Sequence, residues 1–351
     1  MFFRAAISAS AAACLLVILG ASGCGGSNTV EKRAVVIVSG GGATSPFTTP
    51  SAACKQGFAA GSTDDALRTA LLKSGYEVFT SPAQVGPSVV TSDATAYGFG
   101  DCPSALPAAM TVNSVGPIDE AGTHLAAFFE HLQMAYGITT IDIVGHSMGG
   151  LFSRSAIKAL KAAHSNLQFR SLTTLGTPWE GAFPADYATG GAVTLADCNG
   201  DAVCEASLTE FKEFWLPNST GAGQQVTRAY LTGPTGWNER QGSALSGIPV
   251  TLIGGDYLKN ASTRTEVWPN DNLVSLRSAL ATGVSDTVLP HRTCLTLPDL
   301  HSIYMADQRK VDRSIGLTFD TKAIAAVTAA IQNAPTALSQ PNRAGCPTAS
   351  N

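Results

Sequence analysis

The chain has 351 residues, of which 44% are hydrophobic and 14% are charged, and its formal net charge at pH 7 is −4. This composition is typical of a globular domain and excludes a disordered or coiled-coil chain. The slightly negative charge lacks the basic excess that nucleic-acid binding requires, so no nucleic-acid partner is expected.

The N-terminal residues 1–23 have the layout of a secretory signal peptide. Arg4 precedes an apolar stretch centred on residues 15–19, and small residues follow at 21–23. Polar residues interrupt the apolar stretch, which is shorter than the roughly 20 residues that a transmembrane helix needs. We therefore expect an exported protein whose flexible segment, residues 24–33, precedes the folded domain.

Residues 21–24, Ala-Ser-Gly-Cys, resemble a bacterial lipobox. The resemblance implies that Cys24 becomes the lipidated first residue of the mature chain and anchors it to a membrane of the bacterial cell envelope. The alternative is a secreted, soluble protein in which Cys24 is a spare cysteine.

Six cysteines follow Cys24, and an even number suits disulfide pairing in an oxidising compartment. Order along the chain favours three pairs that each close one loop or tail region: Cys54 with Cys102, Cys198 with Cys204, and Cys294 with Cys346. No C-x-x-C pattern and no Cys/His zinc spacing is present, so no metal is predicted.

The first strand is predicted at residues 34–38, an uninterrupted apolar run typical of a strand buried on both faces. A glycine-rich turn follows at residues 39–43. Amphipathic patterns then predict helices over 64–74 and 118–136, with a strand over 76–79 between them.

A short apolar strand over residues 141–144 leads into the turn Gly-His-Ser-Met-Gly, residues 145–149, and a helix begins at Met148. This is the G-x-S-x-G pattern of a nucleophile elbow, in which the serine, Ser147, takes a strained conformation and the flanking glycines avoid collisions. The N–H groups and positive dipole end of the helix favour negative charge beside the serine.

Through this GHSMGG segment the chain resembles the α/β-hydrolase superfamily, in particular its lipase and esterase branch. The resemblance implies an α/β fold with a mostly parallel central sheet flanked by helices, and further strands are expected over residues 172–175 and 249–253. The domain is expected over 34–340, with an inserted cap over about 182–247 and a C-terminal tail over 341–351.

Within the cap, Ser207 to Glu210 form a capping box that predicts the start of a helix. Its apolar side, which includes Leu208, Phe211 and Trp215, suits either a movable lid over a lipid pocket or a helix packed on the core. We take Trp215 as a substrate-binding candidate on the first interpretation.

The resemblance also implies an oxyanion hole and a pocket for the acyl group. One N–H donor comes from the residue after the nucleophile, here Met148, and another from the loop after the first strand, where Gly41 is expected and Gly42 is second. Trp179 follows a Gly-Thr-Pro segment similar to one near the active site of lipases, so it is either a substrate-binding residue or a core tryptophan.

In this family the catalytic acid and base follow the serine in that order. Asp271 lies in Asn-Asp-Asn-Leu-Val, similar to the segment that holds the catalytic aspartate in many bacterial lipases, and Asp256 is the competing acid. His301 lies in a late loop before the last helix and is the expected base, with His291 second.

These residues predict a serine hydrolase that cleaves carboxylic esters of lipid-like acyl chains without a cofactor. A short-chain carboxylesterase and an acyltransferase share the same catalytic residues and stay open as alternatives. An alternative of another class is a non-catalytic envelope protein built on the same scaffold.

Overall fold

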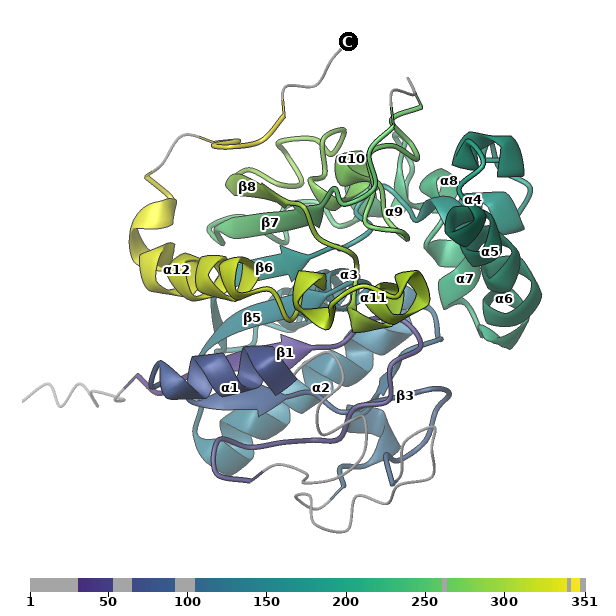
Figure 1. The fold of residues 1–351 in the computed structure, drawn as a ribbon. Helices are drawn as coiled ribbons and strands as arrows, with labels where there is room; N and C mark the ends of the chain where they lie inside the picture. Colours follow the sequence, from purple (N-terminus) through teal and green to yellow (C-terminus); the bar gives the residue numbers. More distant parts are fainter. Residues whose placement is uncertain (1–30, 53–64, 92–104, 261–263, 340–341, 348–351) are drawn as a thin grey trace, which may run out of the picture. The chain divides into compact units, whose positions relative to one another are not determined.

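The computed structural model describes residues 31–52, 65–91, 105–260, 264–339 and 342–347. Its main sheet has six parallel strands in the order β2-β1-β5-β6-β7-β8 (Figure 1), and a second, two-stranded sheet pairs β3 with β4. The strands span β1 Arg33–Val38, β2 Val78–Thr80, β3 Ala83–Gln84, β4 Val112–Asn113, β5 Thr140–His146, β6 Gln168–Leu175, β7 Val250–Gly255 and β8 Arg292–Leu297.

The longer helices flank the main sheet, and short helices make up much of the segment between β6 and β7 (Figure 1). The helices span α1 Asp65–Lys73, α2 Ile118–Tyr136, α3 Gly149–Ala162, α4 Phe183–Ala188, α5 Ala202–Glu210, α6 Leu216–Asn218, α7 Ala222–Gln225, α8 Arg228–Leu231, α9 Trp237–Arg240, α10 Leu276–Ala279, α11 Ile303–Arg309 and α12 Thr321–Ala337. A π-helical turn, η4 (Phe211–Trp215), joins α5 to α6, and short 3-10 turns occur at η2 Ala108–Met110, η3 Leu195–Cys198 and η5 Arg313–Ile315.

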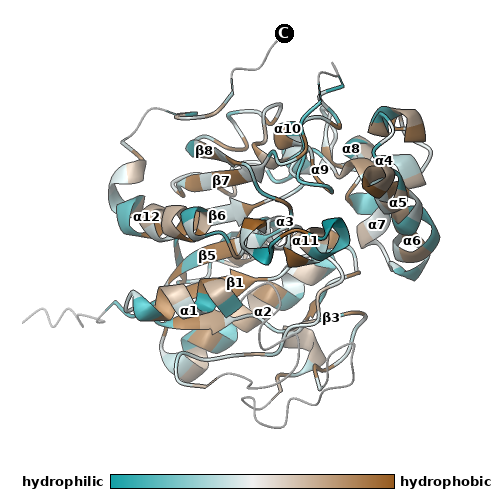
Figure 2. Cartoon of the chain, viewed as in Figure 1, coloured by the Kyte–Doolittle hydropathy of each residue, from teal (hydrophilic) through white to brown (hydrophobic). Residues whose placement is uncertain are grey.

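The uninterrupted apolar strands are explained by cores on both faces of the sheet. Alternate residues of β1 point to opposite faces: Val36 joins the core formed with α2 and α3, whereas Val35 joins the core formed with α1 and α12. Figure 2 shows β1 and β5 coloured mainly as hydrophobic, whereas α1 and α12 carry both colours. The expected α/β fold with a parallel, helix-flanked sheet is therefore confirmed.

The cap helix starts earlier than its sequence pattern predicts. Asp201, and not Ser207, caps the N-terminus of α5, because its carboxylate accepts a hydrogen bond from the Cys204 N–H. Ser207 lies inside α5, where its hydroxyl donates to the Val203 carbonyl. The predicted capping box is therefore wrong, since a helix already formed across residue 207 leaves no orphan N–H groups there.

Two of the three expected disulfides are present. Cys198 pairs with Cys204 at the start of α5, and Cys294 on β8 pairs with Cys346 in the C-terminal tail. The second bond fixes the tail beside the edge strand, where the Cys294 N–H donates to the Ala344 carbonyl. The expected Cys54–Cys102 pair, the signal segment and Cys24 lie outside the described residues. No helix in the described ranges is long and apolar enough to cross a membrane.

Candidate active site

Ser147 lies in the sharp turn between β5 and α3, and its φ of 53° is the left-handed conformation that a nucleophile elbow requires. Three hydrogen bonds hold the turn in place. The Ser147 N–H donates to the Leu175 carbonyl at 2.8 Å, and the Ser147 carbonyl accepts from the Thr177 hydroxyl at 2.7 Å and from the Gly150 N–H at 3.2 Å. The strained residue is thus held by the end of β6 and the start of α3.

Both elbow glycines occupy positions that cannot hold a side chain. A Cβ atom on Gly145 would lie 2.7 Å from the Gly150 nitrogen, and one on Gly149 would lie 2.2 Å from the Val38 carbonyl oxygen. Because these neighbours are backbone atoms, they cannot move aside as a flexible side chain can. The G-x-S-x-G spacing is therefore required by the close approach of β1, β5 and α3.

His301 and Asp271 form the hydrogen-bonded pair that the chain order predicts. The His301 Nδ1 lies 2.8 Å from the Asp271 Oδ2, and both side chains are buried. The other carboxylate oxygen, Oδ1, accepts the N–H groups of Leu273 at 3.0 Å and Val274 at 2.7 Å. The neighbouring Asn272 has a φ of 87°, a conformation that asparagine tolerates where glycine is absent.

Neither of the two competing residues takes part in the His301–Asp271 hydrogen bond. Asp256 forms a salt bridge with Lys259 at 3.1 Å. His291 immediately precedes β8, whereas His301 follows it, so the two histidines lie at opposite ends of that strand. Ser147 follows the carboxyl end of the parallel strand β5, which is the edge of the sheet that His301 shares.

The glycine-rich loop after β1 lies against the nucleophile. A Cβ on Gly40 would lie 2.5 Å from the Ser147 Cβ, and a Cβ on Gly41 would lie 2.8 Å from the Met148 Sδ. The Gly42 N–H donates to the Ser114 carbonyl at 3.1 Å, which removes it as a free donor. Within the described part of the chain, the N–H groups of Gly41 and Met148 donate to no other group, which leaves both for an oxyanion.

A cavity of about 190 Å³ opens over these residues. Five of the predicted site residues line it, so the structure brings them to one space: Ser147, His301, Gly41, Met148 and Trp215. The rest of its wall is mainly apolar and includes Pro178, Ala182, Phe211, Leu273 and Met305. Asp271 lies behind His301, outside the cavity wall.

The two candidate substrate-binding tryptophans lie in different parts of the structure. Trp215 lines the cavity and packs on the loop after β1, where its ring lies 3.0 Å from the position of a Gly41 Cβ. Trp179 is fully buried in the core, where the Arg154 guanidinium stacks on its ring at 4.2 Å. The expectation that Trp179 lines the acyl pocket is therefore corrected: the preceding Gly-Thr-Pro segment reaches the site, but the tryptophan turns away from it.

Two further residues contribute to the site although the sequence did not single them out. Gly176, with a φ of 58°, leaves room for the base and acid, because a Cβ there would lie 2.9 Å from the His301 Nδ1 and 3.0 Å from the Asp271 Oδ2. His146 contacts His301 directly, with its Nε2 2.8 Å from the His301 carbonyl oxygen. The sequence features that could have indicated these two residues are the position of Gly176 directly after β6 and the position of His146 inside the elbow.

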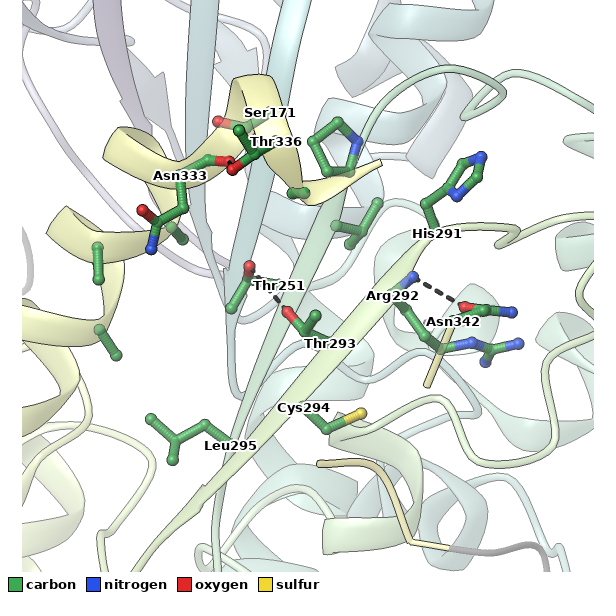
Figure 3. Close-up of a pocket in the computed structure, with 16 residues that line it drawn as sticks. Ser171, Thr251, His291, Arg292, Thr293, Cys294, Leu295, Asn333, Thr336 and Asn342 are labelled. Atoms are coloured by element: carbon green, nitrogen blue, oxygen red, sulfur yellow. Dashed lines mark hydrogen bonds between the residues drawn. The ribbon is translucent and has the colours of Figure 1, made fainter. Parts of the chain in front are cut away.

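A larger cavity of about 510 Å³ lies between α12 and strands β7 and β8 (Figure 3). His291 and Arg292 line it together with hydroxyl and amide side chains, and Thr251 and Thr293 are hydrogen-bonded to each other across the two strands at 3.2 Å. None of the proposed catalytic residues lines this cavity. The smaller cavity therefore remains the candidate active site.

Among the described residues, no group of three or more His, Cys, Asp or Glu side chains could hold a metal ion. The chemistry available at the smaller cavity is that of a serine hydroxyl, a histidine–aspartate pair and two peptide N–H groups. Together with a six-stranded parallel sheet and the serine, aspartate, histidine order along the chain, this arrangement defines an α/β-hydrolase.

Comparison with known proteins gives the same class. The family model described as "Alpha/beta hydrolase of unknown function (DUF915)" matches residues 108–214, which contain the elbow. No curated protein matches the chain. The chain therefore has an α/β-hydrolase fold, and the family model covers the part of it that holds the elbow.

Solved structures similar to this chain include two enzymes of low sequence identity. The mature lipase BlEst2 of Bacillus licheniformis is 16% identical, with 71% of this chain and 80% of that chain covered and a TM-score of 0.39. The esterase Pf2001 of Pyrococcus furiosus is 14% identical, with 87% of this chain and 84% of that chain covered and a TM-score of 0.47.

Proposed function

We propose that this protein is a carboxylic ester hydrolase with a lipase-like preference for lipid acyl chains. The observation that carries the proposal is the convergence of three features on one apolar cavity: the strained Ser147, the His301–Asp271 pair and two uncommitted peptide N–H groups. An acyl-transfer reaction through a serine nucleophile requires these three parts.

In the proposed reaction the Ser147 Oγ attacks the ester carbonyl carbon while His301 accepts its proton. The Asp271 carboxylate holds the ring through Nδ1 and stabilises the imidazolium. The N–H groups of Met148 and Gly41 stabilise the oxyanion. His301 then gives its proton to the departing alcohol and activates the water that hydrolyses the acyl-enzyme.

Labelling by a fluorophosphonate tests this function directly. The wild-type protein is expected to gain one phosphonyl adduct on Ser147, seen by peptide mass spectrometry, and to hydrolyse p-nitrophenyl esters. Ser147→Ala and His301→Ala should each lower kcat by about 10⁶-fold, because triad members act as a unit. A folded wild-type protein without the adduct would favour a non-catalytic envelope protein.

The cavity volume favours a second candidate, a carboxylesterase for short acyl chains. About 190 Å³ lies below the 300–1,000 Å³ of typical small-molecule sites. A long acyl chain therefore requires the cap to move, and Trp215 and Phe211 on η4 are the cap aromatic side chains that line the cavity. A π-helical turn often marks a functional position in a helix, which suits a moving segment.

The two candidates differ in their response to Trp215→Ser. For a lipase with a lid, activity on a long-chain ester should rise sharply once the substrate forms an interface, and this variant should weaken that rise about tenfold while butyrate turnover stays nearly unchanged. Met134→Ser, which removes an exposed apolar side chain on α2 away from the cavity, is the control. Smooth saturation without an interfacial rise would assign the short-chain candidate.

We also propose that the protein is exported and anchored through lipidated Cys24. The two described disulfides support export, because such bonds persist in oxidising compartments. Intact-mass analysis of membrane-extracted protein should give a chain that starts at Cys24 and carries acyl groups. A chain that starts there without added mass would assign the secreted, soluble form.

A further inference from the structure

His146 lies between Gly145 and Ser147 at the end of β5, and it is buried although its side chain is polar. Its Nε2 lies 2.8 Å from the carbonyl oxygen of His301. The two imidazole rings also approach each other, with centroids 4.9 Å apart and planes tilted by 45°. The residue next to the nucleophile is thus in direct contact with the expected base.

The protonation state of His146 follows from this environment. Burial and the neighbouring His301 lower the pKa of His146 to about 3, and the hydrogen bond to the His301 carbonyl only partly opposes them. At neutral pH the ring is therefore uncharged and carries one N–H. Because a carbonyl oxygen can only accept, that N–H is on Nε2 and donates to His301.

Three hydrogen bonds fix His301, and they come from two different parts of the fold. The His301 N–H donates to the Asp271 carbonyl and its Nδ1 bonds the Asp271 carboxylate, both at 2.8 Å. These two bonds connect the base to the acid loop. The bond from His146 connects the base to the nucleophile strand, from the residue that precedes Ser147.

We infer that His146 is a positioning residue that sets the distance between Ser147 and His301 by holding the His301 peptide against the nucleophile elbow. The inference rests on the proposed function, in which these two side chains exchange a proton. The acid loop orients the imidazole ring, and His146 keeps it within reach of the serine. An error of about 1 Å in such a placement costs about 100-fold in rate.

Three substitutions at residue 146 separate hydrogen bonding from packing. His146→Gln keeps an N–H donor at about the reach of Nε2, His146→Asn keeps the amide but is too short, and His146→Leu fills space without a donor. The matched control is His124→Leu on α2, because the His124 Nδ1 bonds a backbone carbonyl, that of Thr111, at the same 2.8 Å but away from the cavity.

The readouts are the rate of Ser147 phosphonylation by a fluorophosphonate, kcat and KM for p-nitrophenyl butyrate, and the Tm. We expect both Leu and Asn at residue 146 to lower kcat and the phosphonylation rate together by about 100-fold with KM unchanged. The Gln variant should stay within about tenfold of wild type. His124→Leu should lower only the Tm.

Phosphonylation of the Leu or Asn variant at the wild-type rate would overturn the inference while the proposed function stands. Equal losses in all three variants, with KM raised and Tm lowered, would also overturn it, because they would assign His146 to packing alone. If the Leu chain does not fold, the comparison of Asn with Gln decides. Absence of phosphonylation in the wild-type protein would overturn the proposed function and this inference together.

Discussion

Two aspartates of the central sheet region are equally buried, yet their partners differ completely. Asp142, near the start of β5, accepts hydrogen bonds from the Nε atoms of Arg33 at 2.6 Å and Arg170 at 3.1 Å, and from the Ser171 hydroxyl. Asp271, in the loop after β7, accepts two backbone N–H groups and faces His301. Neither side chain is exposed to solvent.

The comparison shows that burial alone does not identify a catalytic acid. Two guanidinium groups neutralise the charge of Asp142, so this carboxylate has no further cation to stabilise. Peptide dipoles solvate Asp271 without cancelling its charge, which leaves that charge for the imidazolium that forms at His301. A buried carboxylate held by peptide N–H groups beside a histidine is thus the chemically available one.

Among the changes to these two aspartates, the largest expected effect is on activity, in Asp271→Asn. An amide can present an N–H to the His301 Nδ1 and so stabilises the wrong tautomer of the base, which lowers kcat by about 10⁴-fold in a triad. Steady-state kinetics with p-nitrophenyl butyrate measures it. Asp256→Asn, at the competing acid, is the control and should keep nearly full activity. A loss of less than tenfold in Asp271→Asn would remove this residue from the triad.

Asp142→Asn should have the opposite effect: it should lower the free energy of unfolding and leave kcat unchanged. Removal of the carboxylate leaves Arg33 and Arg170 without their charged partner in a buried setting, which costs about 3 kcal/mol of unfolding free energy. Urea titration measures this loss. The kcat per folded molecule should not change, and a tenfold fall in kcat would show that the two ends of the sheet are coupled.

Sequence patterns predicted the regular parts of the fold and most of the candidate site. The central strands β1 and β5 are recognisable because they are buried on both faces, and the elbow because its glycines are required by backbone contacts. His301 and Asp271 followed from chain order and local similarity, and the structure brings them together.

Two of the failures, at Trp179 and at His146, share a physical cause, which is contact between distant residues. Trp179 turns into the core because Arg154 and Trp237 stack there, with the guanidinium 4.2 Å from one ring and 4.8 Å from the other. A buried arginine between two tryptophans leaves no periodic pattern in the chain. The contact of His146 with His301 joins residues 155 positions apart and is equally invisible to local patterns.

Asp299 is a third buried carboxylate, and it extends the comparison. It is stabilised by protonation, whereas cations stabilise Asp142 and peptide N–H groups stabilise Asp271. Burial, together with the neighbouring Asp320 and Asp256, raises the pKa of Asp299 to about 8, and Lys322 only partly opposes this. Among the described residues its Oδ2 has no hydrogen-bond partner. We expect Asp299 to be neutral in the folded protein at pH 7.

The smallest expected effect is therefore a pH dependence of stability. Between about pH 4, where an unfolded aspartate ionises, and pH 8, the folded state holds a proton that the unfolded state has lost, so stability falls as pH rises. Lys322 opposes part of the rise in the pKa of Asp299, and we expect the Tm to fall as the pH rises from 5 to 8.5.

Asp299→Asn isolates this contribution, because the amide is neutral at every pH and all other groups titrate alike in both proteins. The difference in Tm, variant minus wild type, should grow between pH 5 and pH 8.5, because only the wild-type protein loses stability through residue 299. Differential scanning calorimetry measures it at both pH values. A constant difference would mean that Asp299 is ionised when folded.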